Sequence, residues 1–280
     1  MRPIGEQTIL ITGATDGMGR RLARELAAQG ATLLLHGRDQ GRGEATLAEV
    51  REATGNDRLV YYRADFASLD EVRRLARRVF DEQGRLDTLV NNAGIGAGLP
   101  GDRRRELSRD GYELRFQVNY LAPFLLTRSL LPLLKASAPA RIVNVASVGQ
   151  APIDFDDVML ERGYDGMRAY SQSKLALIMF TFDLAAELEG TGVTANALHP
   201  ASLMDTKMVF ESFGYTMSRV EDGVAATMRL VTDPGLEGVS GRYYDQLREA
   251  RAHRQAYDPD ARARLRTLSE RLTGLAPPAP

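Results

Sequence analysis

A tyrosine and a lysine four residues apart are the residues of this chain best suited to acid–base chemistry. Tyr170 and Lys174 lie in the stretch Tyr-Ser-Gln-Ser-Lys, and Lys174 is one of three lysines among 36 basic residues. Residues at i and i+4 share one helix face, so this spacing places the phenol beside the ammonium. A neighbouring positive charge lowers the pKa of a phenol, ordinarily near ~10, which would let Tyr170 exchange a proton near neutral pH. An isolated pair is more often a solvated helix surface, so other motifs must support this interpretation.

A glycine-rich segment near the N-terminus gives the first support. Gly13, Gly17 and Gly19 have the spacing G-x-x-x-G-x-G, directly after an apolar run and before an amphipathic helical pattern. Glycines at such a turn let a diphosphate approach the backbone, and the N-terminus of the following helix supplies amide donors. This context predicts a dinucleotide site, although a strand–helix turn without a ligand remains the alternative.

The end of the second apolar run bears on which dinucleotide is bound. An acidic residue there would bind the adenosine ribose diol and reject a 2′-phosphate. The chain instead has Gly37 followed by Arg38, which offer space and a guanidinium partner for a phosphate. Asp16 opposes this, because a carboxylate repels a phosphate unless it points to solvent or caps the helix. We therefore expect NADP(H) to be favoured over NAD(H).

Short apolar runs alternate with longer helical patterns along the chain, which predicts an α/β fold with a single doubly wound parallel sheet and helices on both faces. The strands are expected at Thr8–Thr12, Thr32–His36, Leu59–Arg63, Thr88–Asn91, Arg141–Ala146 and Val193–Leu198. The helices are expected near 18–29, 43–54, 69–83, 110–135 and 168–190.

We expect two parts in one domain. Residues 1–249 form the dinucleotide-binding and catalytic part, and residues 250–280 form a helical extension that ends in a frayed tail. A stripe of leucines marks the packed side of that extension: Leu265, Leu268, Leu272 and Leu275.

Further motifs follow in order: Asp65 after the third strand, Asn91 to Gly94 (N-N-A-G), Asn119, Ser147 after the fifth strand, and His199-Pro200 after the sixth. With the glycine loop and the Tyr170–Lys174 pair, this series resembles the short-chain dehydrogenase/reductase family, whose fold is of the Rossmann type. The resemblance implies a catalytic tetrad of Asn119, Ser147, Tyr170 and Lys174. In it Ser147 binds the substrate oxygen, Tyr170 is the general acid or base, Lys174 lowers the pKa of Tyr170 and binds the nicotinamide ribose, and Asn119 holds a water.

The resemblance also implies the residues that contact the cofactor. Asp65 and Phe66 would flank the adenine, the N-N-A-G segment would lie along the middle of the cofactor, and Asn91 could instead support its strand. The expected contacts are Gly13, Thr15, Asp16, Gly17, Met18, Gly19, Arg38, Asp65, Phe66, Asn92, Ala93, Gly94, Tyr170, Lys174, Pro200, Ala201 and Leu203.

The spacing between Ser147 and Tyr170 is long and resembles the retinol-dehydrogenase-like branch and its bacterial relatives, which implies a bulky apolar, aromatic or polycyclic substrate. Three segments, 95–108, 148–168 and 201–218, are expected to converge beside the nicotinamide. Their apolar side chains suit a small hydrophobic ligand: Leu99, Phe155, Met159, Met204, Met208, Phe210, Phe213, Tyr215 and Met217. Each of them could equally pack a lid against the body.

Composition narrows the function classes. The net charge is −1, with 36 basic and 37 acidic residues, which gives no field that favours nucleic acid. The chain has no cysteine and three scattered histidines, so we expect no metal site and redox chemistry through an organic cofactor. No secretory signal or membrane span is expected, which indicates a cytoplasmic protein. The resemblance implies a homodimer or homotetramer through the helices near 110–135 and 168–190.

The leading hypothesis is an NADPH-dependent carbonyl reductase that can also oxidise the alcohol. A catalytically silent NADP(H)-binding regulator on the same fold is the alternative, although such a protein needs only the cofactor loop. A sugar-nucleotide epimerase is less well supported, because those relatives have G-x-x-G-x-x-G and a larger C-terminal domain.

Overall fold

The computed structural model of the protein describes residues 1–99 and 103–275. A single sheet crosses it in the order β3-β2-β1-β4-β5-β6-β7-β8, parallel throughout except for the antiparallel last pair. The strands are β1 (Thr8–Ile11), β2 (Thr32–Gly37), β3 (Leu59–Arg63), β4 (Thr88–Asn91), β5 (Ala140–Val145), β6 (Val193–His199), β7 (Tyr243–Asp245) and β8 (Arg248–Glu249). All six predicted strands are confirmed within one residue at either end.

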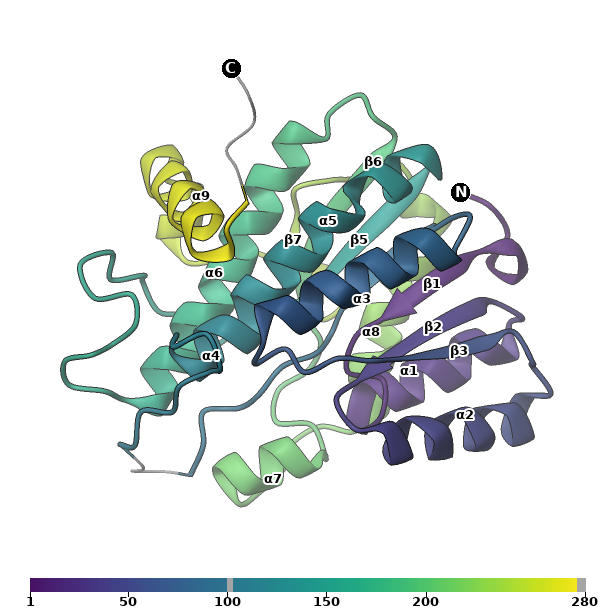
Figure 1. Ribbon diagram of the computed structural model, residues 1–280, viewed down its shortest axis with the longest axis horizontal. Coiled ribbons are helices and arrows are strands. Elements are labelled where there is room, and N and C mark those ends of the chain that lie inside the picture. Colours follow the sequence, from purple (N-terminus) through teal and green to yellow (C-terminus); the bar gives the residue numbers. More distant parts are fainter. Residues whose placement is uncertain (100–102, 276–280) are drawn as a thin grey trace.

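Helices cover both faces of the sheet (Figure 1). On one face, α1 (Gly17–Ala28) packs against α2 (Gln40–Thr54) and α8 (Val220–Thr232). On the other, α3 (Leu69–Glu82) packs against α5 (Ala122–Ala136), which also contacts α6 (Gly166–Glu187). The predicted doubly wound α/β fold is therefore confirmed.

The sheet is apolar on both faces because successive side chains of a strand point to opposite sides. In β1, Leu10 joins the core beneath α3, α5 and α6, whereas Ile9 and Ile11 join the core beneath α1 and α8. All three side chains are fully buried. In β2, Leu34 joins the first of these cores and Leu35 the second, and both are fully buried as well.

The prediction of one continuous helix over residues 110–135 is wrong, because the structure has three consecutive elements there. A short helix, α4 (Leu114–Phe116), leads into a π-helical turn at Gln117–Leu121, and only then does α5 begin. Such a turn inserts one extra residue into a helix and re-aims the side chains on it, and it is frequent at functional sites. Asn119 lies in this turn and is fully buried.

The C-terminal extension also differs from the expectation. Residues 254–257 form a single 3-10 turn, and the helix α9 (Pro259–Thr273) begins only at the proline. Asp258 caps it by accepting hydrogen bonds from the backbone N–H groups of Asp260 and Ala261. Proline suits the first turn of a helix, where its missing N–H has no partner to lose. Of the predicted leucine stripe, Leu265 is buried and the other three are partly buried against the core.

α9 covers the outer side of α6, beside which it lies in Figure 1. Tyr120 Oη and Ser269 Oγ are 2.5 Å apart, and Arg266 pairs with Asp183 at 3.1 Å. Every residue of α6 from 171 to 181 is buried within one chain. The chain's own C-terminal helix therefore packs on this part of α6, and the homodimer or homotetramer expected through the helices near 110–135 and 168–190 stays a prediction.

The helices α7 (Lys207–Phe213) and α8 and the strands β7 and β8 had no counterpart among the predicted elements. None of the helices within the described residues is long and apolar enough to cross a membrane.

We expect Tyr120→Phe to destabilise the protein by about 1 kcal/mol, because it removes a buried hydrogen bond between α9 and the main body. Urea unfolding monitored by circular dichroism measures the change. Tyr215→Phe is the control, since Tyr215 is exposed and should leave the free energy of unfolding unchanged. Equal stability of both variants would contradict the contribution of the Tyr120–Ser269 bond.

Candidate active site

The four residues of the predicted tetrad meet at the carboxyl edge of the sheet. Ser147 follows β5, Tyr170 and Lys174 lie on α6, and Asn119 lies in the π-helical turn. The Lys174 Nζ donates to the carbonyl of Val145 at 2.9 Å and lies 5.8 Å from the centre of the Tyr170 ring. A hydrogen bond joins the side chains of Tyr170 and Ser147.

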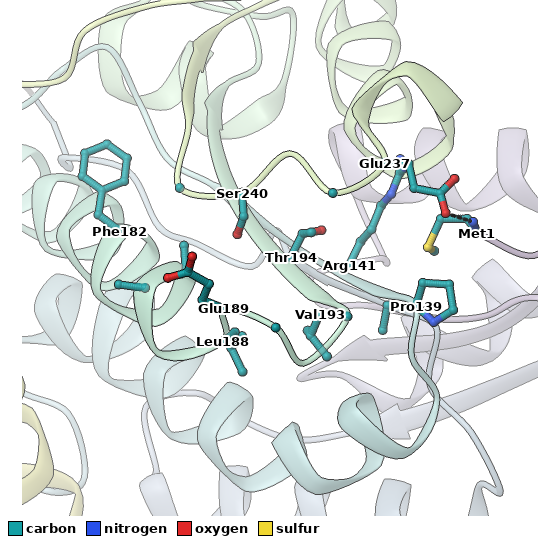
Figure 2. A pocket seen from close by; sticks show the side chains of 17 residues that line it. Met1, Pro139, Arg141, Phe182, Leu188, Glu189, Val193, Thr194, Glu237 and Ser240 are labelled. Carbon is teal, nitrogen blue, oxygen red and sulfur yellow. Dashed lines mark hydrogen bonds and ion pairs between the residues drawn. The ribbon is translucent and has the colours of Figure 1, made fainter.

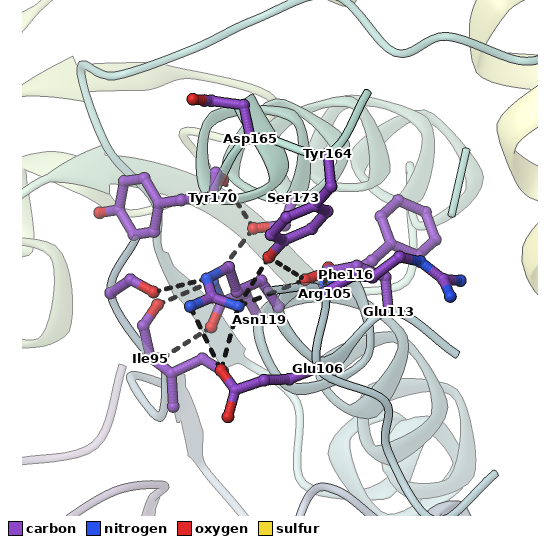
Figure 3. A network of polar contacts seen from close by, with 12 residues as sticks. Ile95, Arg105, Glu106, Glu113, Phe116, Asn119, Tyr164, Asp165, Tyr170 and Ser173 are labelled. Atoms are coloured by element: carbon purple, nitrogen blue, oxygen red, sulfur yellow. Dashed lines mark hydrogen bonds and ion pairs between the residues drawn. The ribbon is translucent and has the colours of Figure 1, made fainter. Parts of the chain in front are cut away.

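Asn119 connects this group to the chain after β4. Its Oδ1 accepts from the N–H of Ile95 at 2.8 Å, and its Nδ2 donates to the Ile95 carbonyl at 3.1 Å. The same Nδ2 reaches Ser173 Oγ at 3.0 Å, and Ser173 in turn donates to the Tyr170 carbonyl at 2.7 Å (Figure 3). Asn119 therefore fixes both the segment at Ile95 and the first part of α6.

Gly94 lies beside both Asn119 and Lys174. A Cβ at Gly94 would be 3.2 Å from Asn119 Oδ1 and 3.5 Å from Lys174 Nζ. Any larger side chain would fill the space in front of the lysine, so the N-N-A-G segment and the tetrad form one site.

Burial is the main cause of the pKa shifts of Tyr170 and Lys174. It raises the pKa of Tyr170 above its ordinary value, and the hydrogen bond with Ser147 only partly offsets this. It also lowers the pKa of Lys174 to about 8. In the protein by itself the pKa of Tyr170 is therefore raised and not lowered, because loss of solvent outweighs the effect of Ser147, and Lys174 is not among the groups that shift it.

The glycine loop is built around close backbone approach. Gly13 has φ of 67°, and a Cβ there would be 2.8 Å from the Ala93 Cα. A Cβ on Gly19 would be 2.2 Å from the Gly13 carbonyl oxygen. Asn92 fixes the loop from the side, since its Nδ2 donates to the carbonyls of Thr12 and Gly13 at 2.8 and 3.1 Å. These glycines, here called the glycine cradle, let the backbone of the loop pack closely against Ala93 and against itself. A tight turn of this kind between a strand and a helix fits the binding of a diphosphate.

Asp16 caps α1 and is neutralised by a neighbour. Its Oδ1 accepts from the Gly17 N–H at 2.8 Å, and its Oδ2 accepts from Arg42 at 2.6 Å. Burial acts to raise the pKa of Asp16, but the hydrogen bonds from Arg42 and Gly17 bring that pKa below its ordinary value. Arg38 is exposed, and in the part of the chain that the structure describes it has no hydrogen-bond or ion-pair partner. The N–H groups of its guanidinium are therefore available to bind a ligand.

His36 is a functional candidate that the sequence motifs did not point to. Its Nδ1 accepts from the Gly13 N–H at 3.3 Å, so Nε2 carries the proton and donates to the Ala64 carbonyl at 3.0 Å. The ring also stacks on Phe66 with ring centres 4.3 Å apart. His36 thus joins the glycine loop to the end of β3. Its position one residue before Gly37 was the only available signal.

Asp65 and Phe66 are placed where the adenine end of a dinucleotide was expected, but their side chains are engaged by the protein. Asp65 accepts from the Ala67 N–H at 3.0 Å and from Arg109 at 3.2 Å. Phe66 is 4 % exposed and its ring stacks on His36, while its carbonyl accepts from Gln117 Nε2 at 3.2 Å, so its ring is not available to a ligand.

The remaining predicted contacts surround the same edge. Thr15 lies against Gly37, where a Cβ would be 2.7 Å from Thr15 Cγ2. Met18 is buried beside α8, so its side chain belongs to the core. Ala201 is buried, and Pro200 lies 3.3 Å from the position of a Cβ on Gly223. Leu203 has φ of 46°, and its carbonyl accepts from the Met217 N–H at 2.8 Å.

The apolar residues expected to line one substrate pocket are dispersed. Phe155 and Met159 pack partly buried on the α6 side, whereas Met204 packs on the α1 side of the sheet. Leu99, Met208, Phe210, Tyr215 and Met217 are exposed, Phe210 and Met217 by 64 % and 70 %. These side chains do not form one packed cluster in the protein by itself, and their convergence on a substrate stays a prediction. Residues 100–102, within the segment 95–108, lie outside the described residues.

A buried ionic network supports the loop at residues 95–98 (Figure 3). Arg115 is 5 % exposed and donates to the Gly96 carbonyl at 3.0 Å and to Tyr164 Oη at 2.8 Å. Tyr164 Oη donates in turn to the buried Glu113 at 3.0 Å. The network joins the long insertion before α6 to the segment beside Asn119.

A cavity of about 680 Å³ lies at the opposite edge of the sheet (Figure 2). It is lined by the first residues of β5 and β6, with Pro139, Phe182 and Glu237 among its walls. It is separated from Ser147 by the whole length of β5, so it plays no part in the chemistry of the tetrad.

Comparison with known proteins agrees with this geometry. The model of the short chain dehydrogenase family matches residues 7–213. The chain belongs to the short-chain dehydrogenase family. It is therefore an oxidoreductase enzyme, and it is 39 % identical to retinol dehydrogenase 13 of Mus musculus, a match covering 96 % of this chain and 84 % of that protein.

Solved structures are similar over most of the chain. An uncharacterised protein from Mycobacterium paratuberculosis has a TM-score of 0.77 and 31 % identity, over 96 % of this chain and 94 % of that one. A short chain dehydrogenase from Shigella flexneri complexed with NADP has a TM-score of 0.71 and 27 % identity, over 87 % and 98 % of the two chains.

The buried His36 should make the folded state sensitive to acid. Burial lowers the pKa of His36 from 6.5 to about 4, so the unfolded chain binds more protons between these two pH values. Stability should fall as the pH is lowered through this window, by about 3 kcal/mol in full, at 1.36 kcal/mol per pKa unit. Urea unfolding at several pH values measures the slope, which His36→Gln should reduce. The same slope in both proteins would contradict the assignment.

Proposed function

We propose that this enzyme reduces the carbonyl of a bulky apolar substrate with NADPH, and reversibly oxidises the alcohol, with Tyr170 as general acid and base. The observation that carries the proposal is the grouping of Ser147, Tyr170, Lys174 and Asn119 beside Gly94 at the carboxyl edge of a parallel sheet. Ligands of open α/β sheets bind at this edge.

The donor set fits a phosphorylated dinucleotide. The cradle of Gly13 and Gly19 would hold the diphosphate, and Arg38 would bind the 2′-phosphate with donors that no described residue uses. Arg42 pairs with the Asp16 carboxylate at 2.6 Å, which reduces the repulsion between this carboxylate and a bound phosphate. The Shigella flexneri relative complexed with NADP supports the same preference.

The residues of the tetrad would share the remaining chemistry once the nicotinamide supplies the hydride. Ser147 Oγ accepts from the Gly149 N–H at 3.0 Å, which leaves its hydroxyl proton for the substrate oxygen or Tyr170. Tyr170, whose pKa is raised, is protonated at neutral pH and can give its proton to the oxygen that becomes the alcohol. Lys174 would bind the nicotinamide ribose hydroxyls and restore the proton through Asn119 and a water.

A lipophilic substrate is supported by two observations. Val148, next to Ser147, is exposed, as are Met208 and Phe210 on α7. The similarity to a retinol dehydrogenase points to the same substrate class. A homodimer or homotetramer remains a prediction, and so does a cytoplasmic location. No observation favours the catalytically silent regulator.

We expect Tyr170→Phe to lower kcat by on the order of 10²–10⁴ without changing the Kd of NADPH, because only the transferred proton is removed. NADPH oxidation at 340 nm against a panel of bulky apolar ketones measures turnover, and quenching of NADPH fluorescence measures binding. Turnover by the variant at the wild-type rate would remove Tyr170 from the proposed role.

Arg38→Ala should weaken NADPH binding roughly tenfold to hundredfold and leave NADH binding unchanged, since hydrogen bonds to a charged group contribute about 1.5–3 kcal/mol. Fluorescence titration with each nucleotide measures the two Kd values. Arg77→Ala, on the exposed side of α3, is the control. An equal loss for both nucleotides would reject a phosphate contact by Arg38.

A further inference from the structure

The loop that carries Ser147 is tied to the C-terminal segment, residues 250–257, through Gln150. The Nε2 of this glutamine donates to the Ser147 carbonyl at 3.0 Å. Its Oε1 accepts from the backbone N–H of His253 at 2.7 Å. One side-chain amide therefore links the backbone of the serine to a residue more than 100 positions later in the chain.

A second glutamine makes the reciprocal connection. Gln255 Oε1 accepts from the Ile153 N–H at 2.7 Å, and Gln255 Nε2 donates to the Ile153 carbonyl at 3.2 Å. Ile153 is buried, so both of its backbone groups would lack partners without this amide. The two glutamines lie on opposite sides of the contact, and each uses a donor and an acceptor.

The strand β7, which precedes the C-terminal segment, fixes Ser147 from another direction. Tyr243 Oη, in β7, donates to the Ser147 carbonyl at 3.0 Å, so this carbonyl accepts two hydrogen bonds. Between Ser147 and Ile153, the loop passes close to the catalytic tyrosine. A Cβ on Gly149 would be 3.4 Å from Ser147 Oγ and 3.8 Å from Tyr170 Cε1.

All three partners of this loop lie outside the region that the family model matches, which ends at residue 213. No motif of the shared family pattern contains Gln255, His253 or Tyr243. Tyr243 and Gln255 nevertheless contact the backbone of Ser147 and Ile153, and the His253 N–H donates to the Gln150 side chain.

We propose that Gln150 and Gln255 are positioning residues that fix the Ser147–Ile153 loop on the C-terminal segment, so that this segment completes the active site. The inference rests on the proposed function, because it assigns Ser147 to the substrate oxygen. The two glutamines act on the placement of the Ser147 hydroxyl relative to Tyr170. They do not act on cofactor binding, because neither side-chain amide contacts the glycine loop or Arg38.

The test compares Gln255→Leu, which removes both hydrogen bonds to Ile153, with Gln255→Glu, which keeps the acceptor and loses the donor. Arg254→Ala is the matched control, because Arg254 is the exposed neighbour of Gln255 in the same 3-10 turn. Three quantities are measured on the full chain: amide hydrogen exchange of residues 148–157, the Kd of NADPH, and kcat and KM for a bulky apolar ketone.

We expect Gln255→Leu to raise amide exchange in residues 148–157 and lower kcat roughly tenfold or more, since small displacements of a reacting group carry large rate penalties. The Kd of NADPH should stay within about twofold of wild type, as expected for a change confined to the transition state. Gln255→Glu should lie between Gln255→Leu and wild type, and Arg254→Ala should match wild type.

Unchanged kcat in Gln255→Leu would overturn the proposal, whether or not exchange rises, because the contact would then be structural only. A parallel loss of NADPH affinity in both Gln255 variants would also overturn it. Failure of the proposed function is distinct, since it would appear as absence of turnover by the wild-type protein, with exchange of the loop still responding to Gln255→Leu.

Discussion

The bond from the buried ammonium of Lys174 to the carbonyl of Val145 is the constraint on which the active site depends. Lys174 is 5 % exposed, and a charge taken out of water is costly unless polar partners surround it. The carbonyl at the end of β5 is such a partner at 2.9 Å, and it fixes α6 against the sheet at this point. Because Tyr170 lies one helical turn before Lys174, the same bond sets how far the phenol reaches toward Ser147.

Every other part of the site is arranged around this fixed helix. The π-helical turn directs Asn119 toward Ser173 on α6 and toward Ile95 after β4, so that the end of β4, the turn and α6 share one set of hydrogen bonds. The buried Arg115 then fixes the next residue of that loop, Gly96. The glycine cradle after β1 and His36 in β2 lie at the same carboxyl edge of the sheet, where the Gly13 N–H donates to His36 Nδ1. On the side of the glycine loop the site is held by hydrogen bonds with Asn92 and His36.

Much of this could be predicted from the sequence because local pattern and physical role coincide. Apolar runs predicted β1 to β6 of the parallel sheet, and the spacing of Tyr170 and Lys174 predicted their common helix face. Asp16 was expected to oppose a phosphate unless it capped the helix, and it does cap α1.

The parts that could not be predicted depend on contacts between distant residues. The π-helical turn at Gln117–Leu121 lies between Gly111 and Pro123 and contains neither, so the sequence did not mark where the helix is interrupted. α9 packs on the main body through pairs such as Tyr120 and Ser269, 149 residues apart. The pKa of Tyr170 depends on how completely neighbouring segments exclude water, which spacing alone does not show. Exposure of Phe210 and Met217 likewise follows from where α7 lies, and composition had indicated only that the segment is apolar.

A crystal structure of the protein with NADP⁺ bound tests the central claim most directly. The account predicts that the nicotinamide ribose lies within hydrogen-bonding distance of Lys174 Nζ and Tyr170 Oη, with the diphosphate against Gly13 and Gly19. A nucleotide bound with its nicotinamide away from both side chains would contradict it.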